Sequence, residues 1–169
     1  MGMDICLCVE RRGANGLWER AEPLVPIQYP YDDFPYPVPG LEREALYEGR
    51  NRTLFRLLQG PIWQLSPGGR SLPYSRGLPD DVSAETRAAF DCDNDPPDLF
   101  GMSWLLLAEL EAFDWSQPLT GSYHRPSGES VTEERPLSHW CKHFLGTTVS
   151  AMRELGPPEG VRAVFWFGN

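Results

Sequence analysis

The sequence is short of long apolar runs and of positive charge. Its apolar runs, such as WLLLA at residues 104–108, fall far below the roughly 20 residues that span a bilayer. The opening MGMDICLCVE has neither a basic region nor a long apolar core, so we expect no secretory signal and a cytoplasmic protein. The net charge is −9, which disfavours nucleic-acid binding because that needs clustered Lys and Arg.

The common catalytic motifs are also missing. The chain has no Gly-x-Ser-x-Gly elbow, no phosphate-binding loop and no dinucleotide-binding fingerprint. Its four cysteines are Cys6, Cys8, Cys92 and Cys141, and without a secretory context we expect reduced thiols. Cys6 or Cys8 could pair with a histidine as a nucleophile, but buried thiols on strands are usually inert. These absences favour a protein without catalytic activity or cofactor.

Size and composition indicate a globular protein with many loops. A chain of 169 residues with 41% apolar residues is expected to form one domain, spanning residues 1–169. Its 17 prolines and 16 glycines predict long ordered loops between short helices and strands.

Two apolar segments near the ends of the chain predict the centre of a sheet. Residues 4–10 and 161–167 read as strands, and both are too apolar to lie at a free edge. We therefore expect them to pair in the middle of the sheet. The Asn15-Gly16 pair predicts a hairpin turn that leads to a returning strand at 17–21.

Four segments are predicted to be helical. The first begins after Asn51 and ends at Gly60, and a short one is capped by Ser83. Another, at 104–113, is expected to be capped by Ser103. The last is the clearest amphipathic pattern, from Pro136 to residue 155. The predicted loops are 23–40, 61–77 and 116–135.

The fold class expected from this order is α+β. It consists of a small antiparallel sheet with the N- and C-terminal strands paired, backed by about four helices, with long Pro-rich loops.

An acidic stretch, DCDNDPPD at residues 91–98, has the Asp spacing with which a calcium loop begins. A calcium loop of the EF-hand type needs Gly at its sixth position and Glu at its twelfth, where this chain has Pro96 and Met102. That reading is excluded. The alternatives are a looser Ca²⁺ or Mg²⁺ site and an acidic turn between two helices, of which the turn is preferred.

The three histidines are weak candidates for a metal site. His139 and His143 are four residues apart on the predicted long helix, which places them on one face. His124 could supply a third imidazole from a loop. We prefer the interpretation that the histidines are polar surface residues, and we expect no bound metal.

Five arginines in loops and helix starts are the stronger candidates for ligand binding: Arg50, Arg52, Arg56, Arg70 and Arg76. Arg50 and Arg52 flank the expected helix start at Asn51, where an anion or phosphate could be held. The alternative is internal pairing with Asp80, Asp81 and the acids of 91–98.

Aromatic residues in the loops complete the predicted binding surface, because they could stack on a flat group beside the arginines. The surface predicted from the sequence consists of Arg50, Asn51, Arg52 and Arg76, with Asp80 and Asp81 nearby and the tyrosines Tyr31, Tyr36 and Tyr74 around them.

Five blocks of the sequence resemble an uncharacterised family of small proteins from bacteria, phages and prophages. They are MDICLCVE (3–10), GRNRTLFRLLQG (49–60), RGLPDDVS (76–83), SWLLLAELEAFDW (103–115) and VRAVFWFGN (161–169). Members of that family typically read MDIHxxVE, RNYxLFxxLxG, RGLPxDVS, SWLxLxEL and VFWFDN. This chain differs at Cys6, where the family often has His, at Arg52, where it has Tyr, and at Gly168, where it has Asp.

The resemblance implies a setting of mobile genetic elements and their hosts, with no assigned activity. In that setting, the expectation is a binding protein without catalytic activity. It would inhibit a host defence component or sequester the small anionic ligand of that component, in the host cytoplasm. The alternatives are a small metal-dependent hydrolase using the histidines and the 91–98 acids, and an immunity or antitoxin protein covering a basic toxin. The oligomeric state is left open.

Overall fold

The N- and C-terminal strands form the centre of the main sheet, as predicted. In the computed structural model, which describes residues 4–27, 40–47, 49–60, 68–93 and 99–168, this sheet has the strand order β2-β1-β8-β5. Strand β1 (Asp4–Arg12) pairs antiparallel with β8 (Val161–Gly168), from Asp4 opposite Gly168 to Arg11 opposite Val161. The expected hairpin also forms, because β2 (Trp18–Arg20) returns along β1.

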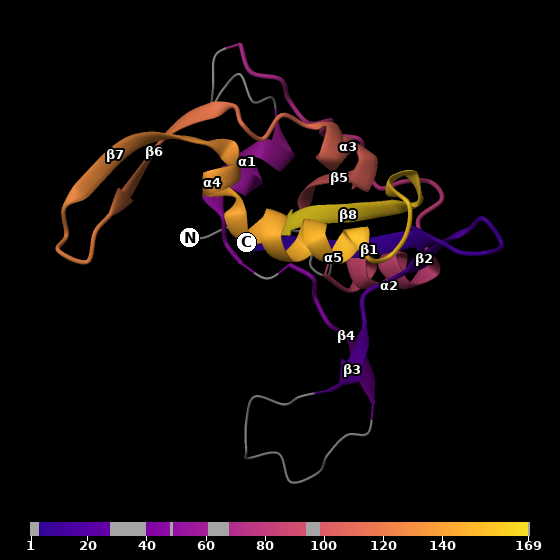
Figure 1. The fold of residues 1–169 in the computed structure, drawn as a ribbon. Coiled ribbons are helices and arrows are strands. Elements are labelled where there is room, and N and C mark those ends of the chain that lie inside the picture. Colours follow the sequence, from indigo (N-terminus) through magenta and orange to yellow (C-terminus); the bar gives the residue numbers. More distant parts are fainter. Residues whose placement is uncertain (1–3, 28–39, 48, 61–67, 94–98, 169) are drawn as a thin grey trace, which may run out of the picture.

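Helices cover both faces of this sheet, which explains why β8 is buried along almost its whole length. Figure 1 shows α1 and α3 on one side of the sheet and α2 on the other. One face of β8 carries Phe165 and Phe167 into the larger core, and the other carries Val164 and Trp166 against Phe90 of α2. The α+β fold class is therefore confirmed.

Two predicted helix starts are confirmed. Helix α1 (Arg52–Gln59) begins after Asn51, whose Oδ1 accepts the Leu54 N–H at 2.9 Å, and ends at Gly60. Helix α2 (Ala84–Asp93) follows Ser83, whose Oγ accepts the Thr86 N–H at 3.2 Å. In both helices a side chain satisfies a backbone donor that the first turn leaves free.

The helix predicted at 104–113 is wrong in its first part. Residues Phe100–Leu106 form strand β5, and only Leu107–Ala112 form helix α3. Periodicity cannot separate a short buried strand from a helix, and pairing with β8 decides in favour of the strand. Ser103 is a buried strand residue whose Oγ accepts the Arg76 N–H, so it caps no helix.

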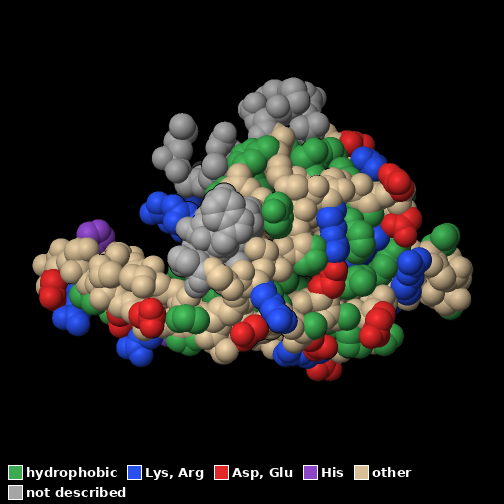
Figure 2. Space-filling model, turned by 90° about the horizontal axis from the view of Figure 1, so that it is seen from above, with side chains coloured by type: hydrophobic (Ala, Val, Ile, Leu, Met, Phe, Trp, Pro, Cys, Tyr) green, Lys and Arg blue, Asp and Glu red, His purple; other side chains and the backbone are tan. Residues whose placement is uncertain are grey.

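The loop predicted at 116–135 is also wrong. It folds as an antiparallel ribbon of β6 (Pro118–His124) and β7 (Ser130–Pro136), closed by a turn in which Gly128 has φ +83°. Most of its side chains are exposed, so the sequence has no apolar alternation that would indicate a strand. Figure 2 shows this ribbon as a lobe that projects from the body, with charged side chains of both signs.

The ends of the predicted loop at 23–40 pair with each other. Strands β3 (Leu24–Pro26) and β4 (Leu41–Arg43) form a short ribbon that extends away from the main sheet in Figure 1. The middle of that loop, with Tyr31 and Tyr36, lies outside the described residues.

The last predicted helix is confirmed as a helical region with an irregular middle. It comprises α4 (Leu137–Trp140), a π-helical stretch η2 (Phe144–Val149) and α5 (Ser150–Arg153). A short 3-10 turn, η3 (Pro158–Gly160), then leads into β8. Among the described residues, no helix combines the length and apolar character needed to cross a membrane.

Candidate functional site

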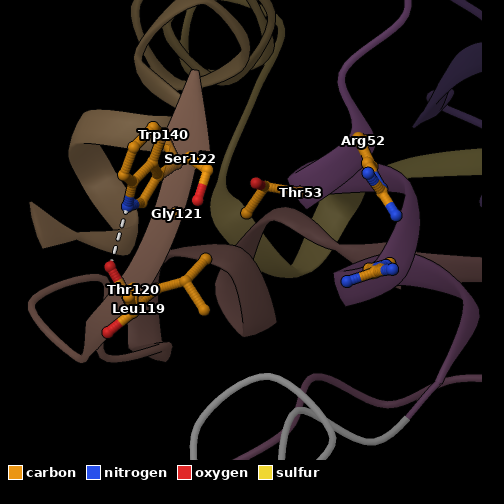
Figure 3. Close-up of a pocket in the computed structure, with 8 residues that line it drawn as sticks. Arg52, Thr53, Leu119, Thr120, Gly121, Ser122 and Trp140 are labelled. Carbon is orange, nitrogen blue, oxygen red and sulfur yellow. Dashed lines mark hydrogen bonds between the residues drawn. The ribbon is translucent and has the colours of Figure 1, made fainter. Parts of the chain in front are cut away.

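A groove of about 410 Å³ lies between the start of α1 and strand β6, and we call it the α1–β6 groove. Figure 3 shows Thr53 between Arg52 on one side and Gly121, Ser122 and Trp140 on the other. It is lined by Arg52, Thr53, Arg56, Leu119, Thr120, Gly121, Ser122 and Trp140.

The α1 wall is positioned by the cap of the helix. Asn51 holds the first turn through its Oδ1, and its Nδ2 donates to the Trp140 carbonyl at 2.8 Å. This side chain therefore ties the start of α1 to the end of α4. Arg52 and Arg56, four residues apart, lie on one side of the helix, and both are exposed.

The opposite wall depends on a close approach between Gly121 and Trp140. A Cβ atom at position 121 would lie 2.6 Å from Cζ2 of Trp140, so only glycine fits without a shift of the ring. The Trp140 Nε1–H donates to the Leu119 carbonyl at 3.1 Å, which fixes the indole against β6. The aromatic ring is thus held at the groove by its own hydrogen bond.

The groove is positively charged within a chain of net charge −9. Among the residues that the structure describes, no Asp or Glu lines the groove, and the guanidinium groups of Arg52 and Arg56 have no ion-pair or hydrogen-bond partner. Thr53, Thr120 and Ser122 contribute hydroxyl groups to the lining, and that of Ser122 also forms a 2.8 Å hydrogen bond with the Thr132 hydroxyl. Guanidinium and hydroxyl donors with a fixed indole form a set that suits an anionic ligand.

Arg50, by contrast, is paired within the protein. Its Nε donates to Oδ1 of Asp4 at 2.5 Å and its Nη2 to Oδ2 at 3.1 Å. The hydrogen bond from Arg50 lowers the pKa of Asp4. Arg50 therefore ties the segment before α1 to the first residue of β1.

The Arg76 guanidinium is also held by contacts within the protein. It binds both carboxylate oxygens of Glu109, donates to the Trp104 carbonyl and lies 4.3 Å from the centroid of the Trp104 ring. The sequence-based alternative, internal pairing, thus describes Arg50 and Arg76, although their partners are Asp4 and Glu109.

The predicted acids lie at the other end of the main sheet. Asp81 accepts from Arg162 at 2.7 Å and from the Trp18 indole at 3.0 Å, and Asp80 is exposed beside it. Arg162 stands opposite Glu10 in the sheet, six residues along β1 from Asp4, which corresponds to roughly 20 Å. The structure therefore does not bring Asp81 together with Arg50.

Of the three tyrosines, only Tyr74 belongs to the described residues. Its side chain is 40% exposed and is not part of the lining of the α1–β6 groove. Among the predicted ligand-binding residues, the groove contains Arg52, with Asn51 directly behind it. Whether these residues bind a ligand stays a prediction.

The described residues hold no group of three or more His, Cys, Asp or Glu side chains that could bind a metal ion. His139 packs edge-on against the Trp140 ring, His143 lies within 3.3 Å of the Thr147 hydroxyl, and His124 ends β6. The acidic stretch at 91–98 was predicted to be a turn between two helices. Its first part, Asp91 to Asp93, belongs to helix α2, so the turn does not begin at residue 91. Residues 94–98 lie outside the described residues.

The thiols on strand β1 and in the last helical region show no sign of activation. Burial raises the pKa of Cys8 and of Cys141 to about 12, and that of Cys6 to about 11. A thiol with so high a pKa carries almost no thiolate at neutral pH, which agrees with the expectation of inert strand cysteines.

The remaining groove residues had little or no signal in the sequence. Arg56 was among the five candidate arginines, and its spacing of four from Arg52 could have placed it on the same helix face. Trp140 and Ser122 could not have been found, because their position depends on the β6–β7 ribbon, which the sequence does not indicate.

Comparisons with family models, with curated proteins and with solved structures find no match for this chain.

Proposed function

We propose that this protein is a non-enzymatic binding protein that captures an anionic ligand in the α1–β6 groove. In the setting implied by the resemblance to phage and prophage proteins, such capture would inhibit a host defence component, either by blocking it or by sequestering its ligand.

The observation that carries this proposal is the contrast among the arginines. Arg50 and Arg76 are each bound to a carboxylate, whereas Arg52 and Arg56 face a groove without a partner among the described residues. Two like charges four residues apart on a helix repel each other slightly, so an anion between them would relieve a cost as well as form hydrogen bonds.

The volume and composition of the groove also support binding. Ligand sites are typically clefts of about 300–1,000 Å³ with a few polar groups that converge on the ligand. The groove, at about 410 Å³, falls in that range and combines two guanidinium groups, three hydroxyls and one indole. Its arginines are positively charged and offer only hydrogen-bond donors, which favours negatively charged acceptor groups.

Native mass spectrometry of the protein purified from its producing cell tests this proposal. The wild type is expected to carry a bound species of defined mass. The double variant Arg52→Gln/Arg56→Gln should lose it, because both charged donors are removed while α1 keeps good helix-forming residues.

The matched control is Arg87→Gln, an exposed arginine of α2 that lies away from the groove. This control changes the net charge in the same direction and should retain the bound species. A species that persists in the double variant, or a wild type that carries nothing, would count against the proposal.

A further inference from the structure

One edge of β6 carries backbone groups that have no bonding partner among the described residues. The Leu137 N–H donates to the Gln117 carbonyl at one end of the β6–β7 ladder, and the Arg125 N–H donates to the Glu129 carbonyl at the other. Hydrogen-bonded pairs occur at every second residue of an antiparallel ladder. The odd-numbered residues of β6 therefore bond to β7, and Thr120 and Ser122 direct their N–H and C=O groups away from it.

Thr120 and Ser122, which carry these outward groups, are both among the lining residues of the α1–β6 groove. In the part of the chain that the structure describes, no backbone group bonds to them from the α1 side. An unpaired strand edge is a template for a further strand. The groove thus offers backbone hydrogen bonds along one wall and guanidinium groups along the other.

We infer that the ligand of the groove is an extended acidic segment of a partner protein, which adds to β6 as a third strand and places its carboxylates on Arg52 and Arg56. This inference rests on the proposed function, since it names the class of ligand that the same groove takes.

The spacing of the charges fits such a segment. Side chains on one face of a strand are two residues apart, a distance of about 7 Å. Arg52 and Arg56 are separated by four residues of α1, a rise of about 6 Å along the helix axis. Two carboxylates separated by one residue in an extended peptide therefore match the two guanidinium groups.

The charges also distinguish the two edges of the ribbon. Strand β6 carries no acidic residue between Pro118 and His124, whereas β7 carries Glu133, Glu134 and Arg135. Arg135 pairs with Glu133, so Glu134 leaves β7 with a net negative charge. An acidic strand would be repelled at the β7 edge and attracted at the β6 edge, where the arginines stand across the groove.

The test uses a fluorescein-labelled peptide, Ser-Val-Glu-Val-Glu-Val-Ser, and measures its binding to the full chain by fluorescence anisotropy. We expect saturable binding that weakens at least about tenfold when both glutamates are replaced by glutamine, because charge-assisted hydrogen bonds are lost. Absence of binding by the parent peptide overturns the inference.

Two N-methylated peptides test strand addition directly, one methylated at both glutamates and the other at the three valines. Only alternate N–H groups of an added strand face β6. One of the two peptides should therefore lose at least about tenfold in affinity and the other should bind like the parent. Equal affinities for both would overturn strand addition.

A pair of variants at Thr120 tests the same contact from the protein side. Thr120→Pro removes the outward N–H and leaves the β7 ladder intact, as proline is tolerated where a strand N–H faces outward. It should bind the peptide at least about tenfold more weakly than Thr120→Val, which also lacks the Thr120 hydroxyl but keeps the backbone N–H. Circular dichroism checks that both variants fold; if Thr120→Pro does not fold, the methylated peptides decide.

Titration with inorganic pyrophosphate separates this inference from the proposed function. Binding of pyrophosphate that needs Arg52 and Arg56, without binding of the peptide, would overturn the acidic segment and leave anion capture standing. Failure of both probes to respond to the Arg52→Gln/Arg56→Gln change would count against both.

Discussion

Arginines at two ends of the molecule lie in opposite electrostatic environments. Beneath α2, Arg162 is only 2% exposed, and it bonds to Glu10 and Asp81, each at 2.7 Å, with its guanidinium 4.1 Å from the Trp18 ring centroid. We call these four residues the Arg162 cluster. In the α1–β6 groove, Arg52 and Arg56 are exposed and have no partner among the described residues.

The difference follows from the cost of burying a charge. Glu10 and Arg162 are almost completely buried, so each must be neutralised and hydrogen-bonded where it stands. Both carboxylate oxygens of Glu10 are hydrogen-bonded, because Oε2 accepts from Arg162 and Oε1 accepts the Ser83 N–H at the start of α2. Arg52 and Arg56 remain hydrated and need no partner for the protein to fold. Among the described residues, no acid neutralises their charge.

The largest expected change in stability is that of the Arg162→Leu variant. The substitution leaves Glu10 buried without its cation, and it is expected to lower the free energy of unfolding by about 3–5 kcal/mol. Urea denaturation followed by tryptophan fluorescence and circular dichroism measures this loss. The Arg52→Gln/Arg56→Gln variant should change the same quantity by less than about 0.5 kcal/mol, as is usual for surface residues.

The control for Arg162→Leu is Arg153→Ala, which removes an exposed ion pair with Glu111. Exposed pairs contribute about 0–1 kcal/mol, so this variant should be close to the wild type. A loss of unfolding free energy for Arg162→Leu no larger than that for Arg153→Ala would show that burial does not distinguish Arg162 from the groove arginines.

A smaller loss of stability is expected for Gly121→Ala, which tests the close packing of Gly121 against Trp140 in the groove. The added methyl group forces the Trp140 ring to move, and overpacking of this kind costs about 1–3 kcal/mol. The control is Gly146→Ala, where an added Cβ meets nothing within 4 Å. Thermal denaturation should place Gly121→Ala below the wild type and Gly146→Ala at or above it. Equal melting temperatures for the two variants would mean that the close approach of Gly121 to Trp140 does not affect stability.

The sequence predicted the parts of the fold that depend on apolar pattern and local capping. Buried strands and helix starts have strong local signals in a sequence. The pairing of β1 with β8 and the helix caps at Asn51 and Ser83 could therefore be predicted. The β6–β7 ribbon was missed, since its solvated side chains carry no apolar alternation. The run at 104–108 was misread because a short buried strand and a helix look alike until their neighbours are known.

The same reasoning explains what could be predicted of the candidate site. Arg52 and Asn51 were identified because the cap and the charge lie together in the sequence. The opposite wall, with Trp140 against Gly121, is built across the missed ribbon. The choice between internal pairing and a free guanidinium could not be made for Arg50, because its partner Asp4 is 46 residues away in the chain. Such pairing is decided by tertiary structure alone.

The smallest expected difference between the Arg162 cluster and the groove arginines is in how stability depends on pH. The hydrogen bond from Arg162 lowers the pKa of Asp81 in the folded protein below its unfolded value of 3.8. Stability from this pair is therefore present above about pH 4 and is lost as the pH falls through the folded pKa. Since the Asp81 side chain is 57% exposed, the contribution should stay below about 1 kcal/mol.

The variant Asp81→Asn tests this effect, since its free energy of unfolding should fall less between pH 5 and pH 3 than that of the wild type. The Arg52→Gln/Arg56→Gln variant should follow the wild-type pH profile, because no described carboxylate pairs with either arginine. Urea denaturation at each pH measures both. A flatter profile in the groove variant would reveal an acid bound to Arg52 or Arg56, and would remove the contrast between paired and free arginines.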